Sequence, residues 1–185
     1  MTANSELSES RRGDEADSEY STTLDELLAR VRRLEDEAAI NRLIMTYGPA
    51  ADAGLTSFAG GLWLEDGLYD WDADGQPYQG SAEVDAMLQA DLHQSLIAAG
   101  VAHFAGPLLI DLQGDEATVL NYSLIMRREE DRSFLWRVSA VRWEVARADS
   151  GWRVRRRTNR LLDATGGGLR LFRDSLTELF EDVTQ

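Results

Sequence analysis

The sequence predicts an α+β fold in which helices come first and an antiparallel sheet follows. Apolar residues recur at helical spacing up to Gly100, and beyond it they alternate in the manner typical of strands. Short polar turns at residues 113–115, 129–131 and 148–150 divide this second part into strands. A chain of 185 residues, 43% of them hydrophobic, is long enough for one core and too short for two ordinary domains and a linker. We therefore expect one folded domain over residues 22–165.

Residues 1–21 are rich in Ser, Glu, Asp and Arg and poor in apolar side chains, so we expect a disordered acidic tail. A capping box at Thr23-Leu24-Asp25-Glu26 predicts the start of a long amphipathic helix that runs to about Tyr47. Gly48-Pro49 would allow a kink. The narrow apolar stripe of residues 27–37 indicates packing on another subunit.

Shorter elements follow this helix. Helices are predicted over residues 57–64 and from Ser81 to about residue 97, and between them the turn Asp72-Ala73-Asp74-Gly75 predicts a β-hairpin of residues 68–71 and 77–80. Four long strands are expected at residues 101–112, 116–128, 133–147 and 151–162. Residues 166–185 form a glycine linker and a final amphipathic helix. Gly166-Gly167-Gly168 is not a dinucleotide loop, because no parallel βαβ unit surrounds it.

Composition excludes several kinds of chemistry. The net charge of -14 repels nucleic acid and anionic lipid, so we expect neither as a partner. The absence of cysteine excludes thiol nucleophiles and cysteine-ligated zinc, and the absence of lysine excludes Schiff bases and a P-loop lysine. The first residues lack the pattern of a signal peptide and no apolar run approaches a membrane span, so we expect a soluble, cytoplasmic protein.

His103 opens an apolar strand, which places the side chain type whose unperturbed pKa lies near neutrality where it is shielded from water. Asp52, at the end of the largely apolar run that contains Tyr47, is the best candidate for a carboxylate partner. Such a carboxylate would fix the tautomer of His103 and make it a general base that can return the proton as an acid. We interpret the two residues as a dyad that needs no cofactor; the alternative is a buried structural histidine.

The other charged and titratable residues favour simpler roles. His93 lies beside Asp91 and Gln94 on the polar face of its helix, so we expect it to be exposed to solvent. An iron site of His93, His103 and Asp52 would require distant elements to converge, and we expect no metal. Five arginines cluster near the end of the sheet and are expected to pair with acids: Arg153, Arg155, Arg156, Arg157 and Arg160.

Several motifs occur in a characteristic order: Tyr47-x-x-x-x-Asp52, Trp63-x-x-Asp66-Gly67, Gly80 before a helix, His103-x-x-Gly106-Pro107, Gly114-Asp115-x-Ala117 and Gly151-Trp152-Arg153-Val154 followed by Arg156-Arg157. Over residues 34–162 this order resembles the SnoaL-like branch of the nuclear transport factor 2-like superfamily. The resemblance implies a cone-shaped α+β barrel in which three N-terminal helices pack in a strongly curved, mostly antiparallel sheet around a deep apolar pocket.

Members of that superfamily include scytalone dehydratase, ketosteroid isomerase and a hexachlorocyclohexane dehydrochlorinase. In the dehydratase and dehydrochlorinase branches an aspartate on the first helix pairs with a histidine from the sheet, and Asp52 and His103 fall on those positions. This chain departs from the family at Leu55, where a second acid is frequent, and at Val141 and Trp143, where many members carry a tyrosine and an acid. These departures imply a different pocket and a different substrate.

The pocket is expected to be lined by aromatic side chains and one amide: Tyr47, Trp71, Phe104, Asn121 and Trp143. Strand alternation leaves open whether Asn121 or Tyr122 faces inward.

These features predict a cofactor-independent lyase (dehydratase) or isomerase that acts on a small hydrophobic cyclic metabolite, of polyketide, terpenoid or steroid-like type. The alternatives are a non-catalytic small-molecule-binding or dimerisation module of the same fold, or the structural subunit of a larger oxygenase. We expect a homodimer through the broad outer face of the sheet.

Overall fold

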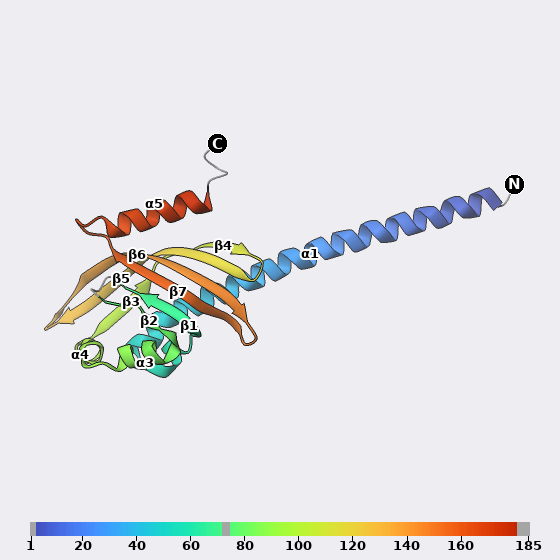
Figure 1. Ribbon diagram of the computed structural model, residues 1–185. Coiled ribbons are helices and arrows are strands. Elements are labelled where there is room, and N and C mark those ends of the chain that lie inside the picture. The colour runs from blue at the N-terminus through green and yellow to red at the C-terminus, as the bar shows by residue number, and fades with distance from the viewer. Residues whose placement is uncertain (1–2, 72–74, 181–185) are drawn as a thin grey trace. The chain divides into compact units, whose positions relative to one another are not determined.

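The computed structural model describes residues 3–71 and 75–180, with side chains from residue 23 onward. The chain divides into two compact units, Met1–Ala38 and Ala39–Gln185. Helix α1 (Ala3–Asp52) contributes to both units (Figure 1). Among the described residues, no helix is both long enough and apolar enough to cross a membrane.

In the first unit, the backbone of α1 is helical from Ala3 onward. The helix passes through Thr23, so the predicted start at the capping box is wrong: a side-chain cap acts only where the preceding residue leaves the helix, and the stretch before it contains good helix formers such as Glu, Ala and Arg. The disordered tail expected over residues 1–21 stays a prediction.

The second unit begins with the last turns of α1, which continue to Asp52. The elements that follow are α2 (Thr56–Gly60), β1 (Trp63–Asp70), β2 (Tyr78–Gln79), α3 (Gly80–Gln89) and α4 (Asp91–Ala99). The single helix predicted from Ser81 is therefore two helices, because the backbone is extended at Ala90, with φ -61° and ψ 146°. The predicted hairpin turn at residues 72–74 lies outside the described residues.

The sheet is built from the hairpins of the second half together with β1 and β2. Its remaining strands are β3 (Val101–Ala105), β4 (Leu109–Gln113), β5 (Glu116–Glu129), β6 (Arg132–Ala148) and β7 (Gly151–Leu161), in the order β2-β1-β7-β6-β5-β3 with β4 also on β5. Among the strand pairs of the described residues, only β1–β7 is parallel. The strand predicted over residues 101–112 is two strands, since Pro107 has no N–H to donate to a ladder. The sheet curves without closing, which confirms the α+β class.

The core lies between the inner face of the sheet and the end of α1. Ile40, Leu43, Ile44 and Tyr47 lie on one face of the helix at helical spacing, and each is at most 8% exposed. Inward residues of the long strands cover them: Val119, Val141, Trp143, Val145 and Val154. Burial of each large side chain contributes roughly 1.5–3 kcal/mol to folding. This packing sets the position of Asp52, one residue after the buried Ala51.

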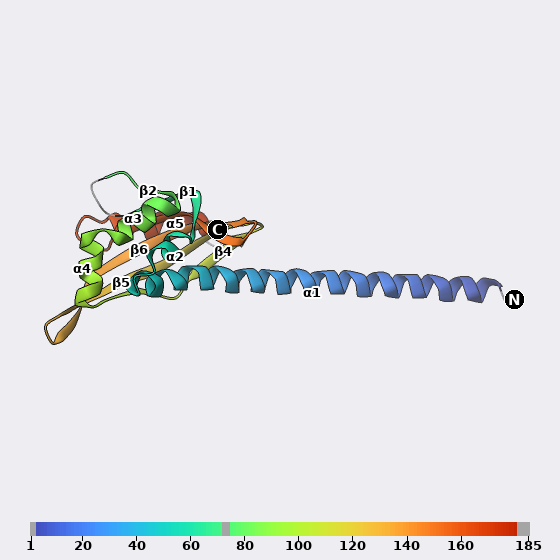
Figure 2. The ribbon, with the colours of Figure 1, turned by 90° about the horizontal axis from the view of Figure 1, so that it is seen from below.

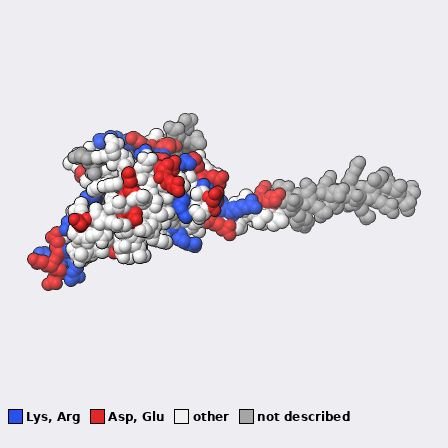
Figure 3. All heavy atoms as spheres, turned by 60° about the horizontal axis from the view of Figure 1, so that its bottom comes forward, with Lys and Arg blue, Asp and Glu red and all other residues white. Residues whose placement is uncertain are grey.

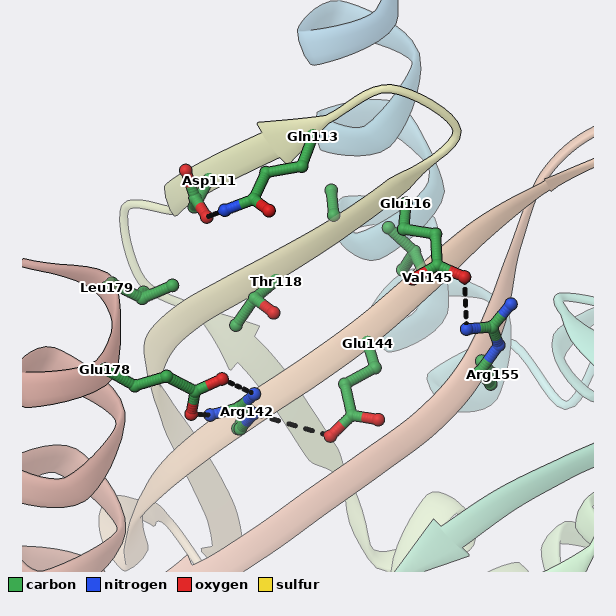
Figure 4. Close-up of a pocket in the computed structure, with 11 residues that line it drawn as sticks. Asp111, Gln113, Glu116, Thr118, Arg142, Glu144, Val145, Arg155, Glu178 and Leu179 are labelled. Carbon is green, nitrogen blue, oxygen red and sulfur yellow. Dashed lines mark hydrogen bonds and ion pairs between the residues drawn. The ribbon is translucent and has the colours of Figure 1, made fainter.

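The opposite face of the sheet carries α5 (Gly167–Leu179), whereas α2, α3 and α4 lie on the inner side (Figures 1 and 2). Arg142 donates two hydrogen bonds to the carboxylate of Glu178, at 2.5 and 2.9 Å. Figure 4 shows the polar groove between α5 and the sheet, in which Arg155 pairs with Glu116 at 2.6 Å. Because α5 occupies part of this face, the homodimer expected through it stays a prediction.

Gly48 allows α1 to lie directly against the edge strand β3. A Cβ atom at this position would collide with the backbone oxygen of His103. No rearrangement of a flexible side chain can relieve that contact, because the obstructing atom belongs to the backbone. The close approach of α1 and β3 therefore requires glycine.

We expect Gly48→Ala to lower the free energy of unfolding by about 1–3 kcal/mol, although alanine normally favours a helix. Urea denaturation measures this difference. Gly75→Ala is the matched control, because its new Cβ would meet nothing within 4 Å. Equal stability of the two variants would contradict the requirement for glycine.

Candidate functional site

The carboxylate of Asp52, at the end of α1, accepts two hydrogen bonds from one residue of β3. The ring Nδ1 of His103 lies 2.5 Å from Oδ1 of Asp52, and the backbone N–H of His103 donates to Oδ2 at 2.7 Å. The two side chains are 20% and 12% exposed for Asp52 and His103, respectively. The contact predicted from the sequence is therefore present in the structure.

The topology explains why this contact forms. β3 ends the strand order and pairs with β5 on one side only, with His103 opposite Ile125. An edge strand has N–H groups that no neighbouring strand satisfies. Asp52 takes the N–H of His103 and, with its other oxygen, orients the ring so that Nδ1 carries the proton and Nε2 keeps a lone pair.

His93 is a second imidazole at this site, contributed by α4. Its ring stacks on that of His103, with centroids 5.7 Å apart. Nδ1–H of His93 donates to the carbonyl of Leu88 at 3.1 Å, and Nε2 is buried without a hydrogen-bond partner among the described residues. Solvent exposure, expected from the sequence, is wrong for this residue. Helix α3 ends before Ala90 and a new helix begins at Asp91, and the rotation of this new helix about its axis places His93 on the inner side.

Burial lowers the pKa of His93, and the nearby His103 lowers it further. The bond to Leu88 and the charge of Asp52 oppose this shift. His93 is therefore neutral at neutral pH, with an acceptor nitrogen facing the interior.

Arg157 of β7 is 3% exposed and lies inside a cage of aromatic rings. Its guanidinium carbon is 4.5 Å from the ring centres of Tyr47 and Trp143 and 4.7 Å from that of Tyr69. Such cation–π contacts favour a cation that has lost its water. Its Nε and Nη1 have no hydrogen-bond partner among the described residues. Two donor nitrogens of a buried cation are thus unsatisfied within the described part of the chain.

Tyr47 joins the two parts of the site. Its ring meets that of His103 edge-on at 6.5 Å and those of Trp63 and Trp143 at 5.4 and 6.2 Å. Burial raises the pKa of the Tyr47 hydroxyl far above its usual range, Tyr69 adds to the rise and Arg157 opposes it. The hydroxyl is therefore protonated at physiological pH.

A cavity of about 160 Å³ lies against these groups. Its lining includes both histidines and two residues of β7, Arg157 and Asn159. The buried Oδ1 of Asn159 has no hydrogen-bond partner among the described residues. The remaining walls are mostly apolar: Tyr69, Trp71, Met87, Leu96, Ile125 and Trp136 among them. Buried polar atoms are normally satisfied, so their concentration around one cavity favours a polar ligand there.

The structure places all five residues predicted to line the pocket at two neighbouring hollows. Tyr47 and Trp71 line the cavity, and Phe104, Asn121 and Trp143 border a much smaller hollow beside it. Asn121 faces inward and accepts a hydrogen bond from Trp143 Nε1 at 2.9 Å, which settles the choice against Tyr122. Phe104 alternates with His103 along β3 and is 49% exposed, so only part of its side chain borders the hollow.

Sequence reasoning missed His93, Arg157 and Asn159. The arginine cluster was expected to pair with acids, and the structure bears this out for three members: Arg155 pairs with Glu116, while Arg156 and Arg160 pair with Asp70. Arg157 points to the opposite face of β7. A signal was present in the sequence. Arg157 and Asn159 are two residues apart and therefore lie on the same face of their strand, and the adjacent strands place aromatic residues on that face.

The described residues contain no group of three or more His, Asp or Glu side chains that could hold a metal ion. On the face displayed in Figure 3, Arg side chains lie among Asp and Glu side chains.

The fold is that of nuclear transport factor 2-like proteins. A crystal structure of a nuclear transport factor 2-like protein with a cystatin-like fold from Novosphingobium aromaticivorans is 39% identical, with a TM-score of 0.76, and the match covers 78% of this chain and 94% of that one. Residues 32–158 match the SnoaL-like domain. The chain belongs to the SnoaL-like family.

More distant structures share the fold. A Mycobacterium tuberculosis protein of unknown function is 18% identical, with a TM-score of 0.65, and the match covers 74% of this chain and 78% of that one. A candidate scytalone dehydratase from N. aromaticivorans is 21% identical, with a TM-score of 0.59 and coverage of 71% and 87%. No curated protein sequence matches the chain.

The depressed pKa of His93 predicts a pH-dependent contribution to stability. The folded state binds this proton less readily than the unfolded state, so the contribution is present above the unfolded pKa of about 6.5 and is lost as pH falls through the folded value. We expect His93→Gln to lose less stability than wild type between about pH 7.5 and pH 5. Urea denaturation at each pH measures the free energy of unfolding of both proteins. The other titrating groups are common to both, so their contributions largely cancel in the difference. Parallel curves for the two proteins would contradict a neutral, buried His93.

Proposed function

We propose that the protein is a cofactor-independent acid/base enzyme, a dehydratase or isomerase, that acts on a small cyclic substrate. The observation that carries the proposal is the Asp52–His103 pair, at 2.5 Å, with its ring against a cavity. The carboxylate holds Nδ1, so the lone pair of Nε2 is left to accept a proton from a substrate.

The groups around the cavity suit proton abstraction from a carbon beside a carbonyl. As His103 takes the proton, negative charge develops on the carbonyl oxygen, and the free donors of Arg157 stabilise charge of that kind. Protonated His103 then returns the proton. Return to a leaving hydroxyl group eliminates water, and return to another carbon moves a double bond.

His93 has a different task in this scheme. It is neutral, and its unprotonated Nε2 can only accept a hydrogen bond, so it cannot donate a proton to the leaving group at the start of the reaction. It orients the substrate by accepting a hydrogen bond from a hydroxyl group. The amide oxygen of Asn159 is a second acceptor on the same cavity.

The size of the cavity limits the substrate. A closed apolar cavity of roughly 150 Å³ holds a molecule the size of benzene. The volume here, about 160 Å³, favours a single six-membered ring with one or two oxygen substituents over a fused polyketide or steroid skeleton. The scytalone dehydratase assignment of one structural neighbour is in keeping with this class of reaction.

We expect Asp52→Asn and His103→Ala to reduce turnover of such compounds by about 10²–10⁴-fold, because each removes the oriented base. A panel of single-ring hydroxy-ketones and epoxides, followed by chromatography, measures the rates. Asp111→Asn is the matched control, since Asp111 contacts Gln113 on the outer face. Turnover that is equal in all variants would end the dyad proposal.

We expect Arg157→Met to reduce kcat by about 10²–10³-fold, as the loss of an oxyanion donor does. Folding stability should be unchanged or higher, because an apolar side chain of similar length replaces a buried charge. Arg155→Met, on the outer face, should leave kcat unchanged. A parallel loss of stability and activity in Arg157→Met alone would assign Arg157 a structural role instead.

A further inference from the structure

The first unit carries an apolar stripe that its own residues do not cover. Leu24, Leu27, Leu28, Val31 and Leu34 of α1 are between 43% and 64% exposed. Five large aliphatic side chains on one face of a solvated helix are costly unless another surface covers them. The stripe lies within Met1–Ala38, and the match to the SnoaL-like domain begins only at residue 32. Most of this surface therefore lies outside the family's domain.

The spacing of the stripe identifies the kind of surface that covers it. Leu24, Leu27, Val31, Leu34 and Ala38 follow one another at alternating steps of three and four residues. They occupy positions a, d, a, d and a of a heptad, the seam along which two helices of a coiled coil meet. Leu at d with a β-branched residue at an a position favours a two-stranded assembly. The positions b, c and f are charged or small, as on the outside of a coiled coil.

The charges beside the seam select the partner and its direction. Arg30 is at position g and Glu35 is at the following e position. In a parallel pair of identical helices, each g side chain lies next to the e side chain of the next heptad on the other helix. Arg30 of one chain then meets Glu35 of the second, twice by symmetry. An antiparallel pair sets g beside g and does not form these contacts.

We propose that residues 24–38 of α1 form a parallel two-stranded coiled coil with the same segment of a second copy of this chain. The seam is short, and a helix of this length gains most of its stability from packing. The proposal is independent of the chemistry at the cavity.

The first test is the molar mass of the full chain by sedimentation velocity at tens of micromolar. The molar mass of wild type should be twice the 20.6 kDa of the single chain. Val31→Glu, in the seam, should weaken this self-association, whereas Ala29→Glu, at position f, adds the same charge on the outside and should associate as wild type does. A monomeric wild type, or a dimer that Val31→Glu does not weaken, would overturn the proposal.

The second test reports which residues meet. The chain has no cysteine, so a single introduced thiol has one possible partner. Val31→Cys should form an intermolecular disulfide on mild oxidation, because facing a positions of a parallel pair are at a separation that a disulfide can span, about 5.5–6 Å between Cα atoms. Ala29→Cys, at position f, should remain reduced. If the seam variant lowers the mass but Val31→Cys does not cross-link, the stripe covers some other surface and the proposal fails.

The third test uses the charges. Arg30→Glu and Glu35→Arg should each weaken self-association, because each places like charges at both flanking pairs. An equimolar mixture of the two variants should restore the dimer, since every flanking pair in the heterodimer is then opposite in charge. Native mass spectrometry distinguishes the heterodimer by its mass. A mixture that associates no better than its components would contradict the parallel pairing.

Discussion

One carboxylate holds the site together. Asp52 accepts a backbone and a ring hydrogen bond from His103, so the end of α1 and the edge strand β3 are joined by the contact that also orients the imidazole. A displacement of the helix would change the position of the ring. Gly48 is part of the same arrangement, because only glycine allows the helix backbone to approach His103 so closely. The position of the end of α1 on β3 and the orientation of the imidazole thus share one contact.

Arg157 is the second constraint, and it is electrostatic. A guanidinium group buried among Tyr47, Tyr69 and Trp143 has lost most of its hydration, and aromatic faces compensate for only part of that cost. Its Nε and Nη1 have no hydrogen-bond partner among the described residues, and Arg157 lies in the lining of the cavity. A ligand with a negative or strongly polar oxygen would satisfy them, whereas a pure hydrocarbon would not. The cost of burial is in keeping with a binding role.

The chain has a segment on each side of the family's domain, and the two segments differ in how much of their surface the rest of the chain covers. At the carboxyl end, α5 packs on the sheet, with Arg142 hydrogen-bonded to Glu178 and Tyr122 against Phe172. At the amino end, the seam of α1 has apolar side chains that its own unit does not bury. One addition thus covers a face of the sheet, and the other has an exposed apolar stripe.

The sequence by itself determined the class of fold, most strands to within a few residues and the Asp52–His103 pair, because period and turn residues are local properties and the family motifs are ordered along the chain. Tertiary structure decided what depends on the phase and direction of an element. The new helix after Ala90 turned His93 inward, and strand alternation placed Arg157 in the lining of the cavity and left Phe104 half exposed. The residues adjacent in the sequence do not determine these orientations, because each orientation depends on which face of the helix or strand the core covers.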